Sequence, residues 1–510
     1  MKTRQYLQIF IIFVLMLGLF GSTTPVQGFE AAKAQPVLVE LATQDPGQMV
    51  RVIVQKMAGA TDAEERVSEL GGQVTQDLRI INAFAAEMSA KDAVQLSKAS
   101  GVRWVSLDAA MESSVCSQCV DTSKLANAYI SAIRADKVWN AKPYIQGQGI
   151  GVAVIDSGVN PNGDLYTNMG VNRQVADIRF NSDYNQSPSD GYGHGTHVAG
   201  IIGGDGSESS GKYIGVAPMV NIINVKVSND DGSARMQDVV QGLQWVLENK
   251  DTYNIRVVNI SLNSAVAESY NTSPLDAAVE ILWFNSIVVV VSAGNTGSGT
   301  IYPPANDPFV ITVGAMDDKG TAVITDDKLA NFSVYGNIEN GSVKPDLVAP
   351  GKNIIARIVN QNMGLAGSHP ANKVGTQYFK MSGTSMAAPM VSGAVALLLQ
   401  DEPGLTPDQV KYRLMATANK SWNGYDAKKA GAGYLDIFAA VNGTTSESVN
   451  TGLLPSQLLT SGPEPITWGS VGWNTVGWNT VGWNTVGWNT VGWNTVGWNT
   501  VGWNTSTWDD

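Results

Sequence analysis

Uniformly apolar runs alternate with segments of helical pattern beyond about Ile130, and this alternation constrains the fold more than any other feature of the chain. The runs read GVAVI, NIINVKV, RVVNISL, IVVVVS and VITVGA, and helical segments follow Gly195 and span 236–247 and 274–284. Strands without polar alternation are typical of parallel sheets that are buried on both faces. Strand followed by helix, repeated, therefore predicts an α/β domain with a doubly wound, mostly parallel sheet.

Three short stretches each place one reactive side chain among small residues. They are GVAVIDSG (151–158) with Asp156, GHGTHVAG (193–200) with His194, and GTSMAAP (383–389) with Ser385. Nucleophilic acyl transfer needs a hydroxyl, a base that activates it and a carboxylate that orients the base. Ligands of doubly wound sheets bind at the carboxyl ends of strands, which is where we expect Asp156 and Asn295.

Each of these residues also has a purely structural interpretation. Asp156 could form a turn or cap a helix, His194 could be structural, and Ser385 could be an N-cap. His197 is interpreted as a packing or hydrogen-bonding residue, and His369 as solvated. A metal site at His194 and His197 is not expected, because the third ligand and the glutamate of a metalloprotease helix are missing.

The apolar segment MAAPMVSGAVALLL predicts a helix that begins beside Ser385. The start of such a helix offers unpaired N–H groups and partial positive charge to a developing oxyanion. We expect Pro389 to be tolerated there, because the amides of the first turn have no partner within the helix.

The three stretches, in this order, resemble those of the subtilisin-like serine proteases, and the resemblance covers roughly 130–445. It implies a subtilisin-like fold and a serine endopeptidase that acts on protein or peptide substrates. By resemblance, Asn295 in SAGN is the side-chain donor to the oxyanion, and Ala293 and Gly294 beside it contact the substrate.

The stretch ISLNS resembles the family's strand that pairs with the backbone of the peptide substrate. Its residues Ser261, Leu262 and Asn263 are therefore expected to bind substrate. Main-chain pairing favours broad peptide specificity. The family usually has Gly where this chain has Asn263, so the preference of the primary pocket stays open.

Segments 1–28 and 29–113 precede the proposed catalytic domain. Lys2 and Arg4 before an apolar run at about 7–20 are typical of a secretory signal peptide, 1–28, and an uncleaved anchor is the alternative. Residues 48–110 show a split β-α-β pattern: strands at 50–55, around 80–88 and at 102–107, and helices at 62–70 and 91–97. This small ferredoxin-like α+β unit resembles the pro-domains that inhibit subtilases, which implies a pro-domain at 29–113 with a junction near 108–114. An ordinary N-terminal domain without an inhibitory role is the alternative.

The remaining chain divides into a catalytic domain at 114–445, a linker at 446–470 and seven VGWNT repeats at 471–505. The uncharged tryptophans of the repeats could contact cell-wall or other polysaccharide, serve as a spacer or self-associate. A non-catalytic or self-trimming scaffold whose tail binds such a surface is thus the alternative function.

Charge and cysteine content exclude several further functions. A net charge of −12 argues against binding to nucleic acid or anionic lipid. Cys116 and Cys119 either form a small local disulfide or remain two thiols. The proposed chemistry requires no cofactor and no metal, and a structural calcium is possible but has no assigned place, since 205–210 (DGSESS) lacks a recognisable ligand spacing. We expect a secreted, extracellular protein, with cell-surface association left open.

Overall fold

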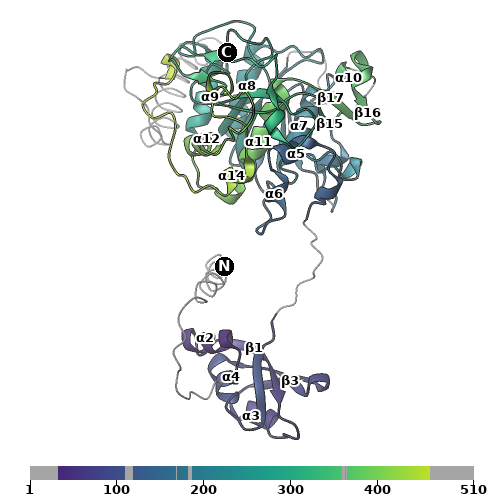
Figure 1. Cartoon of the computed structure of the whole chain (residues 1–510), viewed down its shortest axis with the longest axis vertical. Coiled ribbons are helices and arrows are strands. Elements are labelled where there is room, and N and C mark those ends of the chain that lie inside the picture. The colour runs from purple at the N-terminus through teal and green to yellow at the C-terminus, as the bar shows by residue number, and fades with distance from the viewer. Residues whose placement is uncertain are drawn as a thin grey trace, which may run out of the picture. The chain divides into compact units, whose positions relative to one another are not determined.

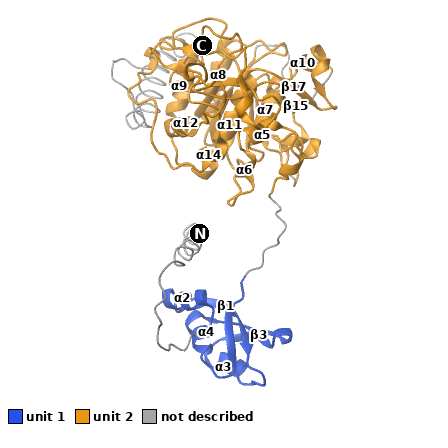
Figure 2. Cartoon of the chain, viewed as in Figure 1, with its two compact units in different colours: residues 1–116 blue, residues 117–510 orange. Residues whose placement is uncertain are grey.

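The computed structural model of the chain describes residues 33–109, 119–167, 169–181, 187–358, 362 and 364–459. The chain divides into two compact units, 1–116 and 117–510, as Figure 2 shows. The expected signal peptide at 1–28 and the VGWNT repeats lie outside the described residues. So does Cys116, whereas Cys119 is disulfide-bonded.

Unit 1 is a four-stranded antiparallel sheet of order β2-β3-β1-β4 with helices on one face. Its elements are α2 (Pro36–Gln44), β1 (Met49–Lys56), α3 (Ala63–Glu69), β2 (Gln73–Leu78), β3 (Ala83–Ser89), α4 (Ala90–Leu96) and β4 (Val102–Leu107). The expected split β-α-β pattern is therefore present, and α2 is an addition that packs against α4. The strands around 80–88 are shifted, because Asn82 adopts a left-handed φ of 51° and turns the chain at Arg79–Ile81.

Unit 2 is built on a mostly parallel sheet of order β11-β10-β9-β8-β5-β7-β6 (Figure 1). Its strands are β5 (Gly151–Asp156), β6 (Gln174–Arg179), β7 (Asn221–Lys226), β8 (Ile255–Ile260), β9 (Val288–Ser292), β10 (Ile311–Asp317), β11 (Lys328–Leu329) and β14 (Leu347–Pro350), which pairs with β10. Only β11 runs antiparallel to its neighbour. The doubly wound α/β prediction is confirmed, and the five apolar runs form β5, β7, β8, β9 and β10.

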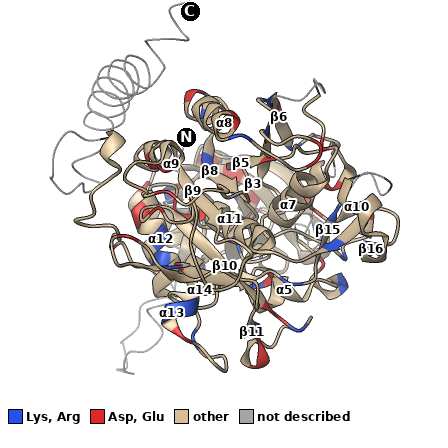
Figure 3. Cartoon of the chain, turned by 90° about the horizontal axis from the view of Figure 1, so that it is seen from above, with Lys and Arg blue, Asp and Glu red and all other residues tan. Residues whose placement is uncertain are grey.

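Two pairs of helices cover this sheet. Helix α7 (His194–Gly203) packs against α11 (Thr384–Asp401), and α8 (Met236–Asn249) packs against α9 (Pro274–Phe284). Burial of α11 is nearly complete, which explains why its sequence is apolar on every side. In the described part of the chain, no helix is long and apolar enough to cross a membrane. Acidic and basic residues are interspersed over the described elements (Figure 3).

The described part of the expected linker, 446–459, lies against the rest of unit 2. Ser456 N donates to both carboxyl oxygens of Glu280 on α9, at 3.1 and 2.8 Å. The amide of Asn450 donates to Asp408 Oδ1 at 2.8 Å, and Leu459 is buried. Residues 446–459, called the strap below, are thus bound to unit 2 by directed hydrogen bonds.

Candidate active site

Asp156 is the last residue of β5, a strand whose six residues are all buried. Its carboxylate oxygen Oδ1 accepts a hydrogen bond from Ser157 N at 2.7 Å. The same oxygen accepts from the Nδ1–H of His194, also at 2.7 Å. A carboxylate in this position fixes the tautomer of His194 and leaves the other ring nitrogen, Nε2, to act as a base.

His194 begins helix α7, and Gly193 before it adopts a φ of 99°, which favours glycine. Gly195 is required for a different reason: a Cβ there would lie 2.2 Å from the carbonyl oxygen of Gly158. Burial alone would lower the pKa of His194, but the carboxylates of Asp156 and Asp190 outweigh it and hold that pKa above its ordinary value. The imidazolium that forms when this residue takes a proton is therefore stabilised by two negative charges.

Asp190 is a residue that the sequence analysis missed. Its buried carboxylate accepts hydrogen bonds from Ser157 Oγ at 2.8 Å, Gly193 N at 2.6 Å, Thr196 N at 2.8 Å and Thr196 Oγ1 at 2.7 Å. One donor belongs to Ser157, which follows Asp156, and the other three belong to Gly193 and Thr196, which lie close to His194 in sequence. The available signal was an aspartate four residues before the motif histidine, but its local sequence does not distinguish it from other loop aspartates.

His197, one helical turn after His194, is fully buried, as the packing interpretation predicted. Its Nε2 bonds the carbonyl oxygen of Phe379 at 3.0 Å. Burial lowers the pKa of His197 to about 4, so this ring stays neutral at physiological pH. His197 supports the fold beneath the site rather than exchanging protons in it.

Ser385 is the second residue of α11 and is largely buried. Its hydroxyl donates to the carbonyl oxygen of Ser261 at 3.2 Å. In the absence of substrate, hydrogen bonds between nucleophile and base are often long or unformed, so this orientation is compatible with a nucleophilic role. The side chain lies where unpaired N–H groups of the helix start are closest.

The expectation for Pro389 was wrong. This proline is the sixth residue of α11, so it lies in the second turn and cannot donate to the carbonyl of Ser385, four residues earlier. That carbonyl accepts the hydroxyl of Ser261 instead, at 3.2 Å. Because the proline leaves this carbonyl without a partner in the helix, the carbonyl can link α11 to Ser261, the residue that follows β8.

Asn295 follows β9, and its side chain is held by one residue of α11. Its Oδ1 accepts hydrogen bonds from Thr384 N at 2.8 Å and Thr384 Oγ1 at 3.0 Å. The hydroxyl of Thr384 in turn accepts from Gly294 N at 3.1 Å. Because the acceptor end of the amide is fixed in this way, the NH₂ end is left to donate. Thr384 is a second residue that sequence reasoning missed.

The predicted substrate residues follow β8 and β9 at the same edge of the sheet as Asp156. Ser261 and Ala293 are buried, and Leu262, Asn263 and Gly294 are half-buried. The amide of Asn263 donates to the carbonyl oxygen of Ser292 at 2.9 Å. The side chain of Asn263 thus crosses from one predicted cleft segment to the other.

No group of three or more His, Cys, Asp and Glu side chains that could hold a metal ion occurs among the described residues. In the loop 205–210, Asp205 Oδ1 accepts from Ser207 N at 2.8 Å, and Glu208 pairs with Arg357 at 2.6 Å. The acidic side chains of this loop therefore already have protein partners.

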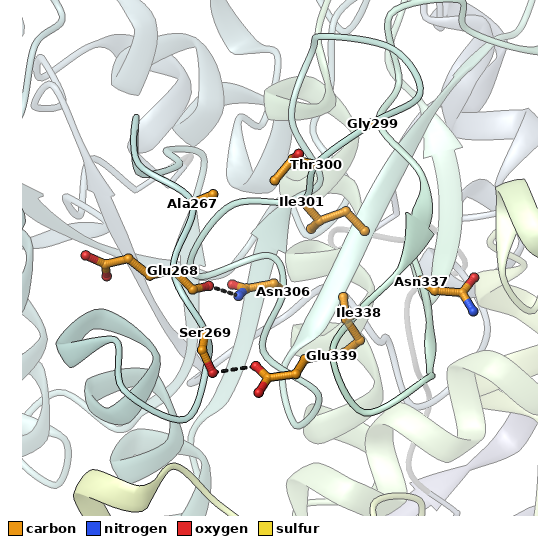
Figure 4. Close-up of a pocket in the computed structure, with 10 residues that line it drawn as sticks. All are labelled: Ala267, Glu268, Ser269, Gly299, Thr300, Ile301, Asn306, Asn337, Ile338 and Glu339. Atoms are coloured by element: carbon orange, nitrogen blue, oxygen red, sulfur yellow. Dashed lines mark hydrogen bonds between the residues drawn. The ribbon is translucent and has the colours of Figure 1, made fainter.

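A pocket of about 630 Å³ lies on unit 2, apart from these residues. Figure 4 shows its lining, in which Ser269 bonds Glu339 and the amide of Asn306 donates to the carbonyl oxygen of Glu268 at 2.9 Å. No histidine lines it, so it lacks the base that a nucleophilic centre requires. At the sheet edge, by contrast, the structure pairs a carboxylate with an imidazole and holds the Asn295 amide against the start of α11, which carries the Ser385 hydroxyl.

Comparison with known proteins agrees with this arrangement. Residues 147–434 match the Subtilase family. The chain is 36% identical over 398 residues to serine protease AprX of Bacillus subtilis (strain 168), covering 76% of this chain and 84% of that protein. It is 30% identical over 397 residues to subtilisin E of the same organism, covering 76% of this chain and 88% of that protein. It is 33% identical over 315 residues to subtilisin DY of Bacillus licheniformis, covering 61% of this chain and 97% of that protein.

The family match spans more than half of the chain and contains Asp156, His194, Asn295 and Ser385. The chain therefore belongs to the subtilase family of serine peptidases.

Proposed function

We propose that the protein is an exported serine endopeptidase that acts through Asp156, His194 and Ser385 and is made as a self-processing precursor. The observation that carries the proposal is the 2.7 Å bond between Asp156 Oδ1 and His194 Nδ1 at the carboxyl end of the central strand. This bond sets the imidazole in the tautomer that a base needs.

The proposed reaction is acyl transfer in two steps. Nε2 of His194 takes the proton of the Ser385 hydroxyl while Oγ attacks the scissile carbonyl, and the same proton then passes to the leaving amine. The acyl-enzyme is hydrolysed by water, which His194 activates in the same manner. The NH₂ group of Asn295 and the backbone N–H of Ser385 donate to the oxyanion in both steps.

Substrate recognition is proposed to run along Ser261, Leu262 and Asn263. An extended peptide that pairs with such a segment is held through its main chain, which suits unfolded proteins of varied sequence. The bridge from Asn263 to Ser292 narrows the space between the two cleft segments. We therefore expect small or medium side chains to be preferred at the cleaved residue.

Unit 1 is proposed to be the intramolecular inhibitor. Only one face of its sheet is covered by α3 and α4. The open face carries the apolar side chains of Ile53 and Trp104, and Trp104 is 41% exposed. Exposed apolar side chains on an otherwise largely polar sheet face are points at which a partner unit can dock, and the expected junction near 108–114 follows β4 directly.

Export is proposed from the expected signal peptide at 1–28, which ends before the described residues begin. The VGWNT repeats would then contact cell-wall or other polysaccharide outside the cell. A repeat segment produced alone should sediment with insoluble polysaccharide, and a chain without it should not. Equal sedimentation of both forms would contradict this part of the proposal.

The test of the proposed activity is hydrolysis of unfolded casein by the full chain and by Ser385→Ala. Loss of the nucleophile should lower turnover on the order of 10⁶-fold, the size found when a subtilisin loses its own. The precursor should persist in the variant, and a serine-directed covalent inhibitor should reproduce the loss of activity. Undiminished hydrolysis by Ser385→Ala would reject the proposal. If the wild-type chain is folded and processed but inactive, the scaffold alternative is favoured.

A further inference from the structure

The two residues that form the base, Asp156 and His194, come from separate segments, and something must hold those segments together. Asp156 ends β5, whereas His194 begins α7, and their side chains meet through one hydrogen bond. A second hydrogen bond joins the two segments: Gly195 N donates to Ser157 Oγ at 3.0 Å. The hydroxyl of Ser157 therefore lies between the segments, and Asp190 lies behind it.

The carboxylate of Asp190 is bound on both oxygens. Oδ1 accepts from Ser157 Oγ at 2.8 Å and Gly193 N at 2.6 Å, and Oδ2 accepts from Thr196 N at 2.8 Å and Thr196 Oγ1 at 2.7 Å. Burial raises the pKa of Asp190, but every one of these partners donates, and such hydrogen bonds favour the charged carboxylate. Asp190 is only 4% exposed, which makes it a buried charge whose field water screens little.

The loop that carries Asp190 is itself fixed. The backbone N of Asp190 donates to Asn160 Oδ1 at 3.0 Å, and Asn160 Nδ2 donates to the carbonyl oxygen of Asp190 at 2.8 Å. The carboxylate is thus anchored at its own backbone as well as at its side chain. A rigid support of this kind is what a precisely oriented hydrogen-bonded pair needs.

We infer that Asp190 is a positioning residue for the peptidase reaction: its carboxylate fixes α7 to the end of β5 and supplies a second negative charge that stabilises the protonated form of His194. This inference rests on the proposed roles of Asp156, His194 and Ser385. It goes beyond them because Asp190 touches neither substrate nor reacting atoms.

The contribution of Asp190 to the pKa of His194 can be separated from the contributions of the other titratable and charged groups around the ring. Asp156 faces the ring from β5, and His197 lies one turn along α7 and stays neutral. On β7, Lys226 directs its ammonium group to the carbonyl oxygen of Ser157 at 2.6 Å and to Asp230 at 2.7 Å. Changing Asp190 alone leaves these groups in place.

The experiment compares Asp190→Asn with Ser157→Ala and Thr196→Val, each in the full chain. Asp190→Asn removes the charge and places an NH₂ group, which cannot accept, opposite two hydrogen-bond donors. The value of kcat should therefore fall about 10- to 100-fold, while KM changes little. Ser157→Ala and Thr196→Val each remove one donor and keep the charge, so their losses of kcat should be smaller. Thermal unfolding of each variant separates loss of fold from loss of alignment.

The effect of the Asp190 charge on the pKa of His194 can be measured without following turnover. His194 is one of only three histidines, so its imidazole signal can be titrated by NMR in the Ser385→Ala chain, with and without Asp190→Asn. The pKa of His194 should be lower once Asp190 is replaced and unchanged in Ser157→Ala. The His194 titration stays informative even if the proposed peptidase function is wrong. A failure of that function would be seen separately, as activity retained in Ser385→Ala.

Two results would overturn the inference. One is an unchanged His194 titration in the Asp190→Asn chain; the other is a kcat within two- to three-fold of wild type for that variant, a change too small for lost alignment. If Asp190→Asn does not fold, Ser157→Ala decides the matter. A wild-type kcat in Ser157→Ala would then reject the positioning role.

Discussion

Two groups of buried carboxyls in unit 2 have opposite environments. At the catalytic edge, Asp156 and Asp190 accept hydrogen bonds from backbone N–H groups, hydroxyls and His194. Asp276 and Glu280 on α9, together with Asp307, are also fully buried, but neither carboxyl oxygen of Asp276 has a hydrogen-bond partner. Asp156 and Asp190 lie beside a histidine, whereas the second group, called the acid cluster below, brings three carboxyls together, of which Glu280 and Asp307 accept backbone N–H bonds and Asp276 accepts none.

The protonation of the acid cluster follows from its burial and from the closeness of its carboxyl groups. Burial, and then the charge of Asp307, raise the pKa of Asp276 and the pKa of Glu280 well above their ordinary values. Burial also raises the pKa of Asp307. Burial raises the pKa of Asp190 as well, but there hydrogen-bond donors oppose the rise, whereas in the acid cluster the neighbouring carboxylates add to it.

The largest effect that would test this comparison is expected from Asp156→Asn. The amide keeps the shape of the side chain but leaves His194 in the wrong tautomer, so kcat should fall about 10⁴-fold. Thermal stability should change little. The matched control is Asp251→Asn, an exposed position, which should keep full activity. A loss of less than about 10-fold would show that a charge at this position is dispensable.

A stabilising effect is expected from Asp276→Asn, the counterpart in the acid cluster. An acid whose pKa is raised by folding binds more protons in the folded state, so stability falls as pH rises from about 4 towards the folded pKa. Removing the group should therefore raise the free energy of unfolding by about 1–3 kcal/mol at pH 9, and by less at pH 5.

Urea unfolding of the Ser385→Ala chain with and without Asp276→Asn at both pH values measures this difference, and casein hydrolysis in the active background should be unaffected. A variant that is less stable at both pH values would show that Asp276 has an essential partner.

A smaller effect on turnover is expected from Thr384→Val. Valine removes the hydroxyl that donates to Asn295 Oδ1, but the backbone donor at 2.8 Å remains. The amide should then lose part of its orientation, and kcat should fall about 10-fold, well short of the 10²- to 10³-fold expected when an oxyanion donor is removed outright. Thr384→Ser keeps the hydroxyl and should restore the rate. If serine is as slow as valine, the hydroxyl does not act through Asn295.

The smallest effect is a displacement of the pH profile. His194 must be neutral to act as a base, and its two neighbouring carboxylates hold its pKa above the ordinary value of about 6.5. Activity should therefore fall on the acidic side with a midpoint above that value. The pH dependence of kcat/KM measures it in the free enzyme. A midpoint below 6.5 would mean that burial outweighs Asp156 and Asp190.

Much of the fold could be predicted from local pattern. The five apolar runs became β5, β7, β8, β9 and β10 because a strand covered on both faces must be apolar along its whole length. Strand β6 was missed because it lies at the sheet edge, where its burial is mixed and its sequence carries polar residues. The composition of the strap predicts a linker, because Ser, Thr, Gly and Pro are typical both of a free segment and of one that is bound through its backbone.

The sequence by itself indicated which residues we propose for the chemistry, because Asp156, His194, Ser385 and Asn295 lie in stretches that resemble those of the subtilases. Tertiary structure alone decided how those residues are held. Asp190 and Thr384 act through hydrogen bonds to segments distant in sequence or on another element, and the carbonyl freed by Pro389 finds its partner in Ser261, 124 residues away. A hydrogen bond depends on distance and direction in space, and neither is encoded in any local run of residues.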